Sequence, residues 1–162
     1  MNLSVVAGPQ TPSVPPVPCD LQMADIQALD LSMIKLKLQD VEEGVGWAPE
    51  VCDSVEQDYK RFLALKRAYP GREIVPNKQV DIFWHQHILD TEKYACDCQM
   101  LFGTFLHHFP YFGMRGEDDY ANLCAAFSET ELLYELHFGG KGSGGKGGSS
   151  KCRTKCKPVQ CK

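Results

Sequence analysis

Apolar residues recur every three or four positions along most of the chain, which is the spacing of helices that bury one face. No segment is predicted as a strand. Between Asp20 and Gly44, two neighbouring apolar stripes predict a single helix with a wide buried face. The first stripe comprises Ile26, Leu29, Met33 and Leu36, and the second comprises Leu31, Ile34, Leu38 and Val41.

Four more helices are expected after this one. Pro49 suits a first helical turn, and the helix that it opens is expected to stop at Tyr69-Pro70-Gly71. Asn77 is expected to cap a short apolar helix. The following helix is expected to start near Asp90 and to end before Gly103.

An aromatic loop is predicted over residues 104–116, and it separates the last helix from the others. Asp118 or Asp119 is expected to cap that helix. Its inward-facing positions are predicted to be Leu123, Phe127, Tyr134 and His137.

These patterns predict an all-α fold, a single compact bundle of about five helices over residues 20–138. Five prolines in residues 1–19 predict a disordered, Pro-rich leader. Residues 139–150 are a Gly/Ser/Lys linker, and residues 151–162 are a basic tail that contains cysteines.

The net charge of −4 conceals an asymmetry along the chain. All 21 acidic residues lie before residue 139, whereas seven of the 17 Lys and Arg residues lie after it. The body therefore carries a charge of −11 and the tail a charge of +7. Because an acidic body repels phosphates, nucleic-acid binding is not expected.

The predicted location is cytoplasmic. The apolar runs are much shorter than the roughly 20 residues that span a bilayer, so no membrane segment is expected. Residues 1–20 contain no Lys or Arg and do not fit the basic start and apolar centre of a secretory signal.

Four of the five histidines lie within 24 residues, which makes this region the strongest candidate for chemistry. Imidazoles combined with a carboxylate suit a zinc, copper or iron ion. The candidate metal ligands are His85, His87, His107, His108, Asp81 and Asp97. A bound ion would activate water or oxygen, but no catalytic residue or substrate is indicated, so enzymatic activity stays open.

Helix geometry divides these candidates. His85 and His87 point to opposite sides of a regular helix and therefore do not bind the same ion. His87 falls on the apolar stripe, whereas His85 lies one turn after Asp81, which would orient its imidazole or share an ion with it. In the alternative interpretation, His87 is a hydrogen-bonded core residue and His85 is exposed or caps the helix. His107 and His108 are then ordinary loop residues.

A second candidate site is formed by Cys152, Cys156 and Cys161 in the tail. The flanking Lys and Arg side chains favour thiolates, which would bind Cu(I) or zinc, form a disulfide, or be modified by a partner enzyme. This predicts a second function class, a non-catalytic carrier or precursor. In the alternative, the tail cysteines have no specific role. The body cysteines are most simply explained as small buried residues, with Cys98 predicted in the core, whereas the role of Cys96 is left open.

The segment from Asp81 to His87, which reads Asp-Ile-Phe-Trp-His-Gln-His, resembles the signature of the glycine-rich domain-containing protein-like family. Plant members of that family carry a comparable Asp-x-x-Trp-His-x-His segment, and the Gly-rich end with cysteines is similar to that of bacterial relatives. The family has no settled biochemical activity, and its plant members are linked to stress and developmental responses. The resemblance therefore implies a third function class, a stress-related regulatory adaptor. It points to the residues Asp81, Trp84, His85, His87, Tyr94, Asp97 and Cys98.

Overall fold

The structure is a computed structural model that describes residues 21–139. These residues form six helices and no strand, which confirms the predicted all-α fold. The helices are α1 (Ala24–Gln27), α2 (Ser32–Gln39), α3 (Pro49–Ala68), α4 (Lys78–Leu89), α5 (Thr91–Phe102) and α6 (Glu117–Phe138). None of them has an apolar stretch long enough to cross a lipid bilayer.

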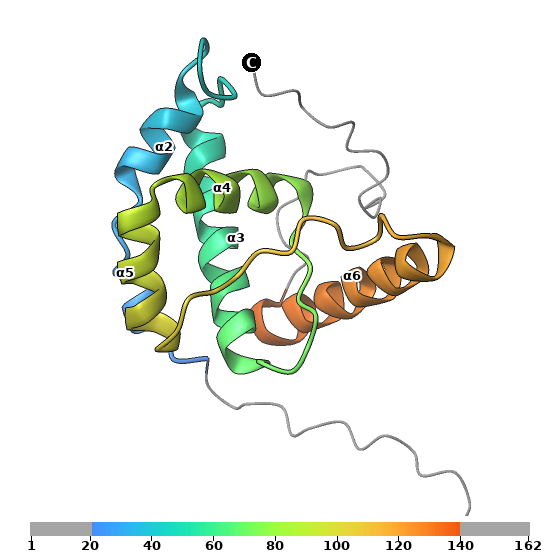
Figure 1. Cartoon of the computed structure of the whole chain (residues 1–162). Coiled ribbons are helices and arrows are strands. Elements are labelled where there is room, and N and C mark those ends of the chain that lie inside the picture. The colour runs from blue at the N-terminus through green and yellow to red at the C-terminus, as the bar shows by residue number, and fades with distance from the viewer. Residues whose placement is uncertain (1–20, 140–162) are drawn as a thin grey trace, which may run out of the picture.

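Helix α3 lies at the centre of the bundle (Figure 1). Helix α4 crosses α3, α2 packs beside both of these helices, and α5 packs on α4. Tyr59 and Phe62 of α3 are fully buried where α4 contributes Phe83, and the rings of Tyr59 and Phe83 lie 5.1 Å apart. Burial of three large aromatic side chains fixes the position of α4 on its support.

Helix α6 extends away from the bundle and returns to the end of α3 with its last turns (Figure 1). The Tyr134 hydroxyl donates a hydrogen bond of 2.9 Å to the backbone carbonyl of Asp58. The Tyr69 hydroxyl and Nε2 of His137 are hydrogen-bonded at 2.7 Å. These contacts account for the predicted inward position of Tyr134, while His137 is only partly buried.

The single helix predicted between Asp20 and Gly44 is wrong, because the chain forms two short helices there, α1 and α2. The Asp30 carboxylate accepts a hydrogen bond from the backbone N–H of Ser32, and Leu31 has a non-helical backbone with φ −113° and ψ 19°. An Asp side chain that binds the backbone in this way competes with helix continuation. The break changes which residues face inward. Met33, Leu36 and Val41 of the predicted stripes are exposed, while Ile26, Leu29, Leu31, Ile34 and Leu38 are buried.

The predicted ends of the helices around the histidine cluster are confirmed. The Asn77 side chain accepts a hydrogen bond of 2.9 Å from the N–H of Val80 and caps α4. Gly103 ends α5 with a positive φ of 67°, a conformation that favours glycine.

The predicted cap of α6 is wrong. The helix begins at Glu117, so Asp119 lies inside its first turn. The Asp119 carboxylate accepts hydrogen bonds from the N–H groups of Gly113 and Arg115, at 2.7 and 3.1 Å. The Arg115 guanidinium, together with these N–H groups, lowers the pKa of Asp119 to about 2. The Asp119 carboxylate therefore holds the end of the aromatic loop in place and does not cap α6.

The predicted leader, almost all of the predicted linker and the whole tail lie outside the described residues.

A buried carboxylate joins α2 to α3. Glu56 of α3 lies 2.7 Å from the ammonium of Lys35 and 2.8 Å from that of Lys60, and little of its side chain is exposed. Burial by itself raises the pKa of Glu56, but the two ammonium groups outweigh it and lower the pKa below the ordinary 4.5. The folded protein therefore keeps this carboxylate charged at pH values where the unfolded chain takes up a proton.

We expect Glu56→Gln to lower the free energy of unfolding at neutral pH by about 1.5–3 kcal/mol, because charge-assisted hydrogen bonds are lost. Since the pKa is lowered on folding, the contribution of Glu56 is present above its unfolded pKa and is lost as the pH falls through its folded pKa. Urea unfolding between about pH 7 and pH 3 measures this, and the difference between the two proteins should shrink below about pH 4.5. The matched control is Asp53→Asn, because Asp53 contacts the same Lys35 but is largely exposed and should contribute little. A difference for Glu56→Gln that does not change with pH would contradict the assignment.

Candidate metal centre

Two of the predicted ligands come from consecutive turns of α4. Asp81 and His85 are four residues apart, so their side chains leave the helix on the same side. Oδ2 of Asp81 lies 3.4 Å from Nδ1 of His85. Asp81 is buried, whereas 46% of the His85 side-chain surface is exposed. The carboxylate is therefore held by the fold, and the imidazole is accessible from outside.

The third residue, His108, comes from the aromatic loop, and a chain of hydrogen bonds holds that loop against α4. The indole Nε1–H of Trp84 donates to the Tyr94 hydroxyl at 2.9 Å, and this hydroxyl donates to the backbone carbonyl of Leu106 at 2.6 Å. The His108 ring lies 4.5 Å from the ring of Trp84 and 4.5 Å from the ring of His85. The loop is thus fixed two residues before His108.

The carboxylate of Asp81 brings the two histidines into one group. Nε2 of His108 lies 3.3 Å from Oδ1 of Asp81, and one ligand atom from each of Asp81, His85 and His108 lies within 4.8 Å of the others. Two ligands bound at 2.0–2.2 Å to one tetrahedral ion lie about 3.3–3.6 Å apart. The two carboxylate–imidazole separations, each to a different oxygen of Asp81, are of this size, and this group could hold a metal ion.

The current hydrogen bonds of His85 fix its tautomer. Nδ1 of His85 lies 2.7 Å from the backbone carbonyl of Asp81, which can only accept, so Nδ1 carries the proton. In the neutral imidazole, Nε2 then carries the lone pair. An ion bound through Nδ1 would replace the hydrogen bond to the carbonyl and release that proton.

Two other predicted ligands, His87 and Asp97, form a separate buried chain. Nδ1 of His87 is hydrogen-bonded to the Tyr59 hydroxyl at 2.8 Å, and Nε2 lies 3.0 Å from Oδ2 of Asp97. Lys93 binds the same oxygen of Asp97 at 2.9 Å. Burial lowers the pKa of His87, against the opposing effect of Asp97. A neutral His87 that accepts from Tyr59 and donates to Asp97 has no lone pair left for a metal.

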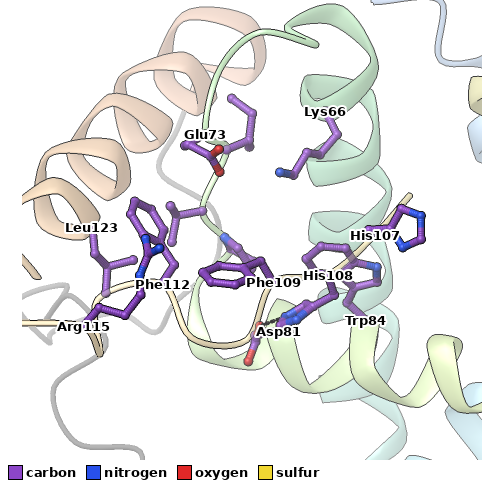
Figure 2. Close-up of a pocket in the computed structure, with 13 residues that line it drawn as sticks. Lys66, Glu73, Asp81, Trp84, His107, His108, Phe109, Phe112, Arg115 and Leu123 are labelled. Carbon is purple, nitrogen blue, oxygen red and sulfur yellow. Dashed lines mark hydrogen bonds and ion pairs between the residues drawn. The ribbon is translucent and has the colours of Figure 1, made fainter. Parts of the chain in front are cut away.

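His107, the remaining histidine of the predicted set, lies apart from Asp81 and His108 (Figure 2). Its ring contacts the ring of Phe105 at 4.9 Å, and the residue is exposed. The second predicted site, Cys152, Cys156 and Cys161, lies outside the described residues.

A pocket of about 340 Å³ lies against the Asp81–His108 side of this group (Figure 2). It is lined by residues from the end of α3, the segment before α4, α4 itself, the aromatic loop and α6. Lys66 and Arg115 line it, although neither was singled out from the sequence. Nothing in the local pattern marks them, because Lys66 is an ordinary position of a long helix and Arg115 is a loop residue.

The fold and the site together define a small all-α protein with a candidate metal group of two histidines and one carboxylate. The chain belongs to the UCP032817-like family, an uncharacterised family whose model matches residues 32–126, more than half of the chain. Asp81, His85 and His108 all lie within the matched residues. Searches of curated proteins and of solved structures found no match. The family description does not mention a glycine-rich domain, so the resemblance based on the Trp-His segment stays a prediction.

Proposed function

We propose that this protein binds one divalent transition-metal ion through Asp81, His85 and His108. The observation that supports this most directly is the convergence of two imidazoles on one buried carboxylate, from elements 27 residues apart in sequence. Nitrogen and oxygen donors of this kind suit zinc, iron or copper, while thiolate ligands would be expected for Cu(I).

Three protein ligands leave at least one coordination position open. Structural zinc sites are closed by four protein ligands, whereas catalytic sites keep a position for water or substrate. An ion at Asp81 and His108 would border the pocket, so its open position would be accessible to a small molecule. This supports a site for metal-assisted chemistry rather than a site that only stabilises the fold.

The test is elemental analysis of the full-length protein, purified without a histidine tag and dialysed against zinc. We expect about one ion per chain in the wild type. Asp81→Asn and His108→Ala should each lower the affinity for zinc at least tenfold, because each removes a ligand. Circular dichroism of each variant shows whether it is folded.

Two matched controls separate this site from other zinc-binding groups. His107→Ala removes the neighbouring exposed histidine and should leave the metal content unchanged. A full-length variant with Ser at positions 152, 156 and 161 removes the tail thiols and should also keep the ion. Zinc that is lost only from this Ser variant, or kept by both Asp81→Asn and His108→Ala, would contradict the proposal.

A further inference from the structure

The pocket beside the proposed metal site has an aromatic side and a polar side, and the polar side carries Lys66, Glu73 and Asp81. Trp84, Phe109 and Phe112 line the aromatic side together with Leu123 at the start of α6 (Figure 2). The pocket volume of about 340 Å³ is at the lower end of the range for pockets that hold organic ligands. The aromatic side favours a ligand with a flat or branched apolar body.

One cationic side chain lines the pocket without an ion-pair partner among the described residues. The ammonium of Lys66, on α3, lies 5.9 Å from the centre of the Phe62 ring. Within residues 21–139, no carboxylate lies at ion-pair distance from this ammonium. Burial lowers the pKa of Lys66, and the Glu73 carboxylate only partly opposes this. An ammonium that has lost water without gaining a partner is stabilised by an incoming anion.

The other permanently charged cation of the pocket is already occupied. The Arg115 guanidinium lies 2.6 Å from Oδ1 of Asp119 and 5.0 Å from the centre of the Phe109 ring. Its charge is neutralised by that carboxylate. Among the described residues that line the pocket, Lys66 is therefore the better group for binding an anionic ligand.

We infer that the pocket binds a small organic carboxylate with an aromatic or branched apolar body. The carboxylate would contact Lys66, and the body would lie among Trp84, Phe109 and Phe112. This deepens the proposed function, on which it rests, since it names the class of molecule that would lie beside the bound ion.

The experiment uses phenylacetate and its neutral counterpart 2-phenylethanol as probes of the full-length protein. Each is titrated by calorimetry, first into protein treated with a chelator and then into zinc-loaded protein. We expect phenylacetate to bind with a Kd below about 1 mM, which a ligand of this size can reach, and at least tenfold more tightly than the alcohol.

Lys66→Met keeps the length of the side chain and removes its charge. It should weaken phenylacetate at least tenfold and leave the alcohol unchanged, whereas the control Lys78→Met, at an exposed position outside the pocket, should change neither. Equal binding of the two probes, no binding of phenylacetate, or unchanged binding by Lys66→Met would each overturn the inference. Phenylacetate binding that depends on Lys66, in a protein that takes up no zinc when dialysed against it, would support the pocket and refute the metal site. Stoichiometric zinc without phenylacetate binding would refute the pocket alone.

Discussion

Replacing Trp84 by alanine is expected to lower the free energy of unfolding by about 3–5 kcal/mol, the range for truncation of a buried tryptophan. Trp84 is 4% exposed, and its ring packs against Phe62 at 5.0 Å on one side and His108 at 4.5 Å on the other. The truncation removes packing in the core and at the candidate site together. Urea unfolding followed by circular dichroism measures the loss.

The same substitution should also weaken zinc binding, because Trp84 fixes the loop that carries His108. Its indole N–H is the first donor in the chain through Tyr94 to the carbonyl of Leu106. Trp84→Phe keeps a ring that can pack against His108 but removes that donor, so it should cost about 1 kcal/mol and weaken zinc binding less than Trp84→Ala does.

A matched control for this effect is Phe83→Leu, one position earlier on α4. Phe83 is fully buried against Tyr59 rather than against the aromatic loop, so the change should destabilise the core and leave zinc affinity unchanged. Trp84→Ala that is within 1 kcal/mol of the wild type, or that binds zinc as tightly, would show that the indole does not hold the loop.

Helices were predictable from the sequence wherever periodicity and local end signals agreed. Asn77 and Gly103 mark their ends by backbone chemistry that depends only on neighbouring residues, and both were located correctly. The split between α1 and α2 was missed because Asp30 acts through a hydrogen bond to Ser32, which competes with an otherwise uninterrupted apolar pattern. The apolar positions of two short helices with a bend between them resemble those of one longer helix.

The candidate site was only partly predictable. Helical spacing alone places Asp81 beside His85 and separates His85 from His87, and both relations hold in the structure. Which of the two loop histidines, His107 or His108, joins Asp81 depends on how the aromatic loop packs on Trp84. No local sequence pattern specifies that packing. Lys66 joins the pocket only through the crossing of α3 and α4, a tertiary relation that periodicity does not contain.

We expect His87→Ala to be comparably destabilising, by about 3–5 kcal/mol. His87 is 1% exposed, so the substitution leaves a cavity, and it also removes the acceptor of the buried Tyr59 hydroxyl. Asp97 loses one partner but keeps Lys93. Equilibrium unfolding in urea at pH 7 measures the change.

A double-mutant cycle assigns part of this loss to the hydrogen bond. Tyr59→Phe removes the hydroxyl that would otherwise be left without a partner, so the combined variant should be more stable than the sum of the single effects predicts, by about 1 kcal/mol. Strict additivity would show that His87 acts by packing alone.

His87 also provides a strict test of which histidines form the metal group. His87→Asn retains polar atoms that can replace one of the hydrogen bonds, so it should remain folded while lacking the imidazole. Because both ring nitrogens of His87 are used by Tyr59 and Asp97, this variant should bind zinc as the wild type does. Loss of zinc from folded His87→Asn would place His87 among the ligands, and the buried chain would then have to open for an ion to enter.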